Sequence, residues 1–186
     1  MIEKILDLDS YLFLYLNNLG SQYYDNFWIF LSRTEANVMF YLVVLIAYIY
    51  SINNKKRTKI LFHLIIAIAI LITISDQTSN LFKDSFQRLR PCYNELIADS
   101  LRLVKDSCGG RYGFFSAHAS NSFSLAIFFG LLLRSSNRLL ILLFTIYAFL
   151  ISYSRIYLGV HYPIDILVGA IFGSINAIVL YKIYLY

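Results

Sequence analysis

The 186-residue chain has few of the residues that mark linkers and metal clusters, with two prolines and three histidines. It also contains no low-complexity stretch and no internal repeat, so we expect one domain over residues 1–186. The histidines are spread along the chain, and His63 is predicted at the opposite end of a membrane span from the other two. This spacing argues against a metal cluster, and we expect no metal and no cofactor.

Charged residues are scarce as well, and this scarcity defines the class of protein. Only 15% of the residues are charged, whereas 59% are hydrophobic. A soluble domain of this size cannot bury so much apolar surface, but a bundle of membrane helices exposes it to lipid. The net charge of +5 comes from scattered basic residues without a basic helix or an RNA-binding pattern. We therefore expect membrane lipids, and no nucleic acid, as partners.

Five apolar runs are candidates to cross a hydrocarbon core about 30 Å thick. They cover approximately residues 38–52, 60–80, 116–133, 139–157 and 164–184. The first is long enough only if it begins near residue 34. The sequence therefore predicts an all-α, polytopic membrane helix bundle with five transmembrane helices.

The N-terminal segment, residues 1–35, contains only short apolar pieces, which polar residues interrupt. Its aromatic residues, including Trp28, suit the headgroup region of a membrane. We expect interfacial helices, and one imperfect sixth span is the alternative. The first nine residues lack the basic region of a signal peptide, so no cleaved signal is expected.

The short links at residues 53–59 and 134–138 together carry six lysines and arginines. Short basic loops face the cytoplasm. The loop at residues 83–115 and the turn around His161 then lie at the outer face. We expect a multi-pass protein of a bacterial inner membrane with this face in the periplasm, where the remaining basic residues are candidates for anion binding.

The first candidate segment of the site contains Lys83 and Arg90. Residues seven apart share a face of a helix, so the two side chains could hold different oxygens of one phosphate group. Asp76 and Asn80 would lie on the same face. An acidic residue inside a span needs a partner, which makes Asp76 a supporting residue for Lys83. The alternative is that the basic residues only extend toward the membrane surface.

The second segment is Phe115-Ser116-Ala117-His118, at the outer start of the third span. Ser116 suits the N-cap of a helix, where the free amides of the next residues, beginning with Ala117, can bind an anion. His118 would stand beside this anion. A structural role for His118 is the alternative.

The third segment contains Arg155, His161 and Asp165. A carboxylate four residues after a histidine can hold one ring nitrogen and leave the other free to react. Pro163 suits the first turn of the last helix, and the helix dipole favours Asp165 there. The pattern does not tell whether His161 lies within this helix or before it.

Together the patterns K-x6-R-P, F-S-A-H and S-R-x5-H-x3-D resemble the signature of the type 2 phosphatidic acid phosphatase family, from about Asp76 to Gly173. This family is related to glucose-6-phosphatase and to vanadium haloperoxidases. The chain departs from the usual Pro-Ser-Gly-His of the second motif, since Phe115 and Ala117 replace the proline and the glycine. An alanine makes a backbone with positive φ less favourable at that position.

The resemblance implies a mechanism without a metal. His161 would attack phosphorus, Asp165 would orient its ring, and His118 would protonate the leaving oxygen and later activate water. The phosphate oxygens would be held by Lys83, Arg90, Ser116, Ala117 and Arg155.

A site at the outer surface suits a phosphate or pyrophosphate whose tail remains in the bilayer. Undecaprenyl pyrophosphate is the preferred substrate, beside phosphatidic acid and phosphatidylglycerol phosphate, and the lipid A phosphates are the alternative within the class. A headgroup-binding or transport protein without catalysis is the alternative of another class, but it leaves the two histidines of the motifs unexplained.

The two cysteines, Cys92 and Cys108, both lie in the predicted outer loop. In an oxidising compartment they would form a disulfide, which closes a loop of about 17 residues and stabilises the fold by roughly 3 kcal/mol. Separate thiols are the alternative.

Overall fold

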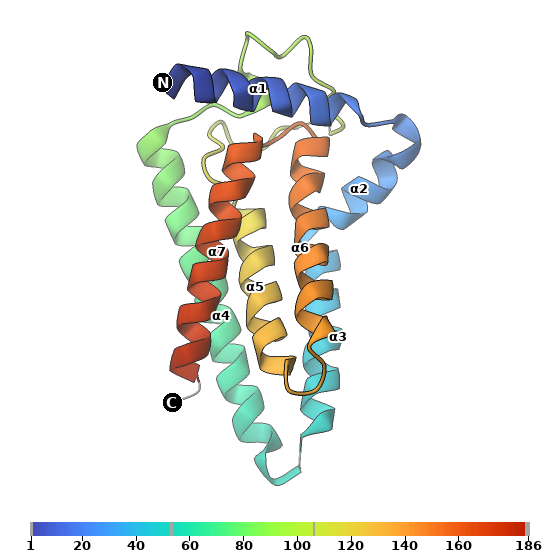
Figure 1. Cartoon of the computed structure of the whole chain (residues 1–186), viewed down its shortest axis with the longest axis vertical. Helices are drawn as coiled ribbons and strands as arrows, with labels where there is room; N and C mark the ends of the chain where they lie inside the picture. The colour runs from blue at the N-terminus through green and yellow to red at the C-terminus, as the bar shows by residue number, and fades with distance from the viewer. Residues whose placement is uncertain (1, 53, 106, 185–186) are drawn as a thin grey trace.

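The computed structural model describes residues 2–52, 54–105 and 107–184, and this part of the chain forms α-helices joined by loops. The helices are α1 (Ile2–Asn18), α2 (Asp25–Leu31), α3 (Thr34–Ser51), α4 (Asn54–Phe86), α5 (Ala117–Leu133), α6 (Leu139–Tyr157) and α7 (Pro163–Tyr184), with two 3-10 turns, η1 (Gln22–Tyr24) and η2 (Pro91–Tyr93). Helices α3 to α7 form a bundle, and α1 lies across one end of it (Figure 1). The predicted basic link begins at residue 53, which lies outside the described residues.

The predicted all-α membrane bundle is confirmed. Helices α3, α4, α6 and α7 are long and apolar enough to cross a membrane, whereas α5 is a shorter apolar helix of 17 residues. Helix α5 packs against α4, α6 and α7 and lies among them (Figure 1). A helix that its neighbours cover need not match the full thickness of the lipid.

Small residues bring α5 and α7 into backbone contact. A Cβ atom on Gly173 would lie 2.1 Å from the carbonyl oxygen of Ser120, and one on Gly169 would lie 2.6 Å from that of Ser116. Two glycines four residues apart permit this close approach of membrane helices. The Ser116 amide also donates a hydrogen bond to the Asp165 carbonyl oxygen, 3.0 Å away. The packing therefore holds the second and third motifs together.

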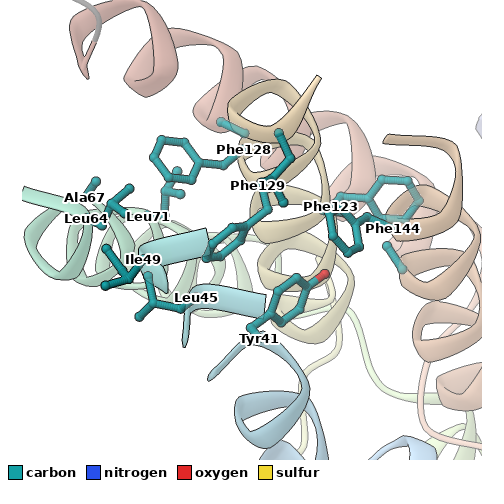
Figure 2. Packing of buried hydrophobic residues seen from close by; sticks show 14 residues of the cluster. Tyr41, Leu45, Ile49, Leu64, Ala67, Leu71, Phe123, Phe128, Phe129 and Phe144 are labelled. Atoms are coloured by element: carbon teal, nitrogen blue, oxygen red, sulfur yellow. The ribbon is translucent and has the colours of Figure 1, made fainter. Parts of the chain in front are cut away.

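The apolar core lies mainly in the half of the bundle away from α1 (Figures 1 and 2). Tyr41 of α3 stacks on Phe129 of α5 with ring centroids 5.6 Å apart, and Phe144 of α6 lies beside them. Leu64 and Leu71 of α4 are fully buried in the same cluster. The end beneath α1 holds the buried charged residues beside smaller apolar clusters, one of which contains Phe13 and Tyr162.

Helix α1 turns a polar face toward the bundle. Asp9 and Asn17 are buried on this face, while apolar residues on the other side are exposed. The Asn17 amide donates hydrogen bonds to the carbonyl oxygens of Ile156 and Tyr157 at the end of α6, and its Oδ1 accepts one from the Arg102 amide. Because α1 crosses the bundle end, it corresponds to the interfacial helix and not to a sixth span (Figure 1).

Candidate functional site

The structure brings the three predicted segments together at the end of the bundle that α1 covers. Lys83 lies in the last turn of α4, His118 in the first turn of α5, and Arg155 in the last turn of α6. His161 lies in the loop before α7, and Asp165 lies in the first turn of that helix. Arg90 enters from the long loop after α4.

Three cations lie near the buried ring of His161. Lys83, Arg90 and Arg155 all act on it electrostatically, which places them nearby. None of the three forms an ion pair within the part of the chain that the structure describes. Arg155 is only 8% exposed, its guanidinium donates to the Ser32 hydroxyl, and its Nε has no hydrogen-bond partner among the described residues. Partly or fully buried cations without a carboxylate partner form a site for an anion.

The expectation that Lys83 and Arg90 share a helix face is wrong. Helix α4 ends at Phe86, and Gln87 then has a positive φ of 47°, which turns the chain out of the helix. Arg90 reaches the site from a loop that pairs with the returning chain, since its amide donates to the Arg111 carbonyl oxygen. The two cations therefore approach from different directions.

The expected pairing of Asp76 with a basic side chain is also wrong. Asp76 accepts a hydrogen bond of 2.9 Å from the Asn121 amide of α5. The ammonium group of Lys83 instead donates to Asn80 Oδ1, at 3.4 Å. Asp76 still acts on Lys83 electrostatically, but the structure shows no ion pair between them.

Arg90 is held by backbone carbonyl groups near a disulfide. Its Nη1 donates to the Cys108 carbonyl oxygen at 2.7 Å, and its Nε donates to that of Tyr112 at 3.2 Å. Cys92 and Cys108 form a disulfide whose Cα atoms are 6.4 Å apart. The bridge thus fixes a backbone segment that holds one of the anion-binding cations.

Replacing both cysteines with serine should lower the apparent Tm in detergent, because a loop of this length contributes about 3 kcal/mol in the chain-entropy model. The KM should rise as well, since Arg90 loses a fixed acceptor. Thermal unfolding and rates of phosphate release measure the two effects, and reductant on the unchanged protein should reproduce them. An unchanged Tm and KM after both thiols have been alkylated would contradict this expectation.

His161 and Asp165 form the predicted pair. His161 Nδ1 lies 3.4 Å from Asp165 Oδ2, and both side chains are buried. The Tyr162 amide also donates to Asp165 Oδ2, at 3.0 Å. Gly159 makes the tight turn after α6 with a φ of 82°, and α7 begins at Pro163. The structure therefore places His161 before the helix and not within it.

The three sequence motifs do not include the side chains that hold Asp165 from its other side. Arg88 donates to Asp165 Oδ1 at 2.8 Å and to Asp9 Oδ2 at 2.6 Å. Its guanidinium carbon lies 4.1 Å from the centre of the Tyr162 ring. Asp9 also accepts a hydrogen bond of 2.9 Å from the Ile164 amide at the start of α7. Helix α1 is thereby joined to the His161–Asp165 pair through Arg88.

The second motif has the predicted helix cap. The Ser116 hydroxyl accepts a hydrogen bond from the Ala119 amide at 3.4 Å, and α5 begins at Ala117. His118 lies close enough to His161 and Arg155 to interact with them electrostatically. The start of α5 thus adds amide groups and a second histidine to the site.

Phe115 is fully buried. It occupies the position at which the phosphatase family that the motifs resemble has proline. Its ring centroid lies 5.3 Å from those of both Phe82 of α4 and Phe172 of α7. Its carbonyl oxygen accepts a hydrogen bond of 2.9 Å from the Ser79 hydroxyl. The aromatic ring therefore anchors the motif between two helices.

The pH dependence of the reaction should reflect the surroundings of His161. Burial, together with the positive charges of Arg90, Arg155 and Lys83, holds the pKa of His161 well below its ordinary value of about 6.5. A neutral nucleophile should therefore persist below that pH. Replacing Arg90 with glutamine removes a positive charge, favours the protonated ring and raises this pKa, so the acid limb of kcat/KM should move to higher pH.

Profiles of kcat/KM for the unchanged protein and the Arg90→Gln variant measure this shift. The ionisation of the substrate is the same in both profiles, so a difference between them belongs to the protein. A limb that stays in place or moves to lower pH would contradict the assignment.

The fold and the site together define a membrane protein that gathers cations and two histidines at the end of the bundle that α1 covers. Comparison with known proteins gives the same class. The model of the PAP2 superfamily matches residues 68–186, and the chain belongs to this superfamily of phosphatases.

Two relatives are similar over nearly the whole chain. A protein of Bacteroides thetaiotaomicron named lipid A 4'-phosphatase is 38% identical over 98% of this chain and 80% of its own length. One of Porphyromonas gingivalis with the same name is 34% identical over 100% of this chain and 76% of its own length.

Two crystal structures have the same fold. LpxE of Aquifex aeolicus has a TM-score of 0.68 and 24% identity, over 92% of this chain and 93% of its own. The transmembrane PAP2-type phosphatidylglycerolphosphate phosphatase of Bacillus subtilis has a TM-score of 0.73 and 12% identity, over 97% of this chain and 86% of its own. At these identities the likeness concerns the fold.

Proposed function

We propose that this phosphatase removes a phosphate group from a lipid A-type substrate at the outer face of the membrane, through a phosphohistidine at His161. The observation that carries the proposal is a set of three cations, Lys83, Arg90 and Arg155, near a buried histidine–carboxylate pair. None of the three has an ion-pair partner among the described residues. Such a site balances the charge of a phosphate group, and the histidine supplies a nucleophile.

In the first step, His161 attacks phosphorus and forms an N–P bond while the bond from phosphorus to the leaving oxygen breaks. Asp165 accepts a hydrogen bond from Nδ1, which leaves Nε2 for the attack and stabilises the positive charge that develops on the ring. His118 gives a proton to the leaving oxygen, so the lipid departs as a neutral alcohol.

In the second step, His118 takes a proton from a water molecule that attacks the phosphohistidine. The N–P bond breaks, inorganic phosphate forms and His161 is restored. The three cations, the Ser116 hydroxyl and the Ala117 amide hold the equatorial oxygens in both steps. The charges that this mechanism needs all come from side chains, so we propose that it proceeds without a metal.

The names of the two relatives favour lipid A over undecaprenyl pyrophosphate, which the sequence analysis preferred. The orientation follows from the short basic link at residues 134–138, which lies at the end of the bundle opposite α1 (Figure 1). A cytoplasmic position of this link puts the site at the outer face. We propose the periplasmic side of a bacterial inner membrane.

Phosphate release by the purified protein in detergent tests the proposal. The panel contains lipid A phosphate, undecaprenyl pyrophosphate, phosphatidic acid and phosphatidylglycerol phosphate, each with and without chelator. We expect the highest kcat/KM with lipid A phosphate, unchanged by chelator. Loss of activity with chelator would overturn the metal-free mechanism. Binding of the lipids without any phosphate release would support a headgroup-binding protein instead.

A further inference from the structure

A cavity of about 270 Å³ lies beside His118, between α3, α4 and α5. Most of its lining is apolar and includes Val38 and Leu125. Asp76 and Asn121 belong to the polar part of the lining, which also includes Thr34, Asn37 and Ser122. Because an ionisable residue inside a membrane span is costly, a carboxylate at this depth requires a functional explanation.

The side chains of Asp76 and Asn121 offer more hydrogen-bond acceptors than donors. Asp76 accepts one hydrogen bond from Asn121 Nδ2 and forms no ion pair with any described residue. Asn121 Oδ1 is buried and has no hydrogen-bond partner in the described part of the chain. A ligand that satisfies this pair must therefore bring O–H or N–H donors.

The position beside His118 indicates which part of the substrate lies there. In an in-line displacement, the leaving oxygen departs on the side of phosphorus opposite His161. The residue that protonates this oxygen is His118, so the leaving group occupies its side of the site. A carboxylate in the cavity disfavours the phosphate itself, which carries the same sign of charge.

From this geometry we infer that the cavity binds the leaving group and that Asp76 and Asn121 accept hydrogen bonds from its hydroxyl groups. The substrate class is then a phosphate ester of a sugar or another polyol, with acyl chains against the apolar wall. Diacylglycerol and polyprenyl phosphate, the leaving groups of phosphatidic acid and undecaprenyl pyrophosphate, carry no hydroxyl group apart from the leaving oxygen itself. This inference rests on the proposed function and adds the residues that select the substrate.

The Asp76→Asn variant tests the inference, because it keeps the shape of the side chain and removes its charge. For lipid A phosphate and phosphatidylglycerol phosphate, whose leaving groups carry hydroxyl groups, kcat/KM should fall about 10- to 100-fold, mostly through KM. For phosphatidic acid it should stay within about threefold, which also reports correct folding. The control is Asp99→Asn, which changes an exposed carboxylate in the loop after α4 and should behave as the unchanged protein.

An equal loss for all substrates would overturn the inference, since it would assign Asp76 to the chemistry or the fold. Unchanged kcat/KM for the substrates with hydroxyl groups would also overturn it. If lipid A phosphate is not hydrolysed, the proposed substrate is wrong. The effect of Asp76→Asn on kcat/KM for phosphatidylglycerol phosphate, compared with phosphatidic acid, still tests the role of the cavity.

Binding without turnover gives a second measurement. In a His161→Ala background, lipids with hydroxyl groups should raise the apparent Tm more than phosphatidic acid does, and Asp76→Asn should remove the difference. Equal shifts for both kinds of lipid before this substitution would overturn the inference.

Discussion

Replacing His161 with alanine should reduce phosphate release by about 10⁴-fold or more, because the variant lacks the nucleophile that the proposed mechanism requires. The remaining cations can still bind the phosphate group, so the KM should change much less than kcat. Phosphate release from lipid A phosphate in detergent, with a thermal unfolding curve to show an intact fold, measures the effect.

His63→Ala provides the matched control. His63 is exposed on α4, and it precedes Lys83 by 20 positions, which correspond to about 30 Å of helix. This variant should keep the activity of the unchanged protein. If His161→Ala retained a tenth of the activity, His161 would not be the nucleophile.

Replacing Arg88 with glutamine should have the largest effect on stability. Arg88 bridges Asp9 and Asp165, and both carboxylates are buried. Removing one partner of a buried ion pair leaves unpaired charge and costs about 3–5 kcal/mol. The apparent Tm in detergent should fall strongly. Because Asp165 loses the group that holds its second oxygen, kcat should fall more than the affinity for the substrate.

The double variant Arg88→Gln/Asp9→Asn separates stability from activity. An asparagine at position 9 can still accept the hydrogen bond of the Ile164 amide and removes one of the two charges that Arg88 balanced. Part of the lost Tm should therefore return, while kcat should stay low because Asp165 is still without Arg88. If Arg88→Gln left both Tm and kcat unchanged, the bridge would have no role in the site.

The helices of the bundle could be predicted because lipid requires long apolar runs, but their ends could not. Helix α4 covers Asn54–Phe86, beyond the apolar run at residues 60–80. Outside the hydrocarbon core a helix no longer needs apolar residues, so hydrophobicity does not mark where it stops. The helix ends where Gln87 adopts a positive φ. The sequence has no glycine at this position that would predict such a turn.

The candidate site could be predicted where a motif brings its residues together locally. The pair His161–Asp165 and the cap at Ser116 depend on neighbours within four residues. The contacts of Arg88 with Asp9 and Asp165 cross 79 and 77 residues of sequence, and a single sequence contains no sign of them.

The sequence contains one indication of which face of α1 contacts the bundle. Asp9, Phe13 and Asn17 are four residues apart and so share one helix face, and all three are buried. Two polar residues on the same helix face as Phe13 indicate a face that contacts protein and not lipid. The pattern could have placed Asp9 near other polar residues, but it could not name Arg88 as the partner.

The most direct test of the account is to stop the reaction of the purified protein with ³²P-labelled lipid A phosphate at short times and to locate the label by peptide mass spectrometry. The account predicts an acid-labile, alkali-stable phosphate on the peptide that contains His161, and no label in the His161→Ala variant. Phosphate release without any labelled peptide, or a label on His118 or on a serine, would contradict it.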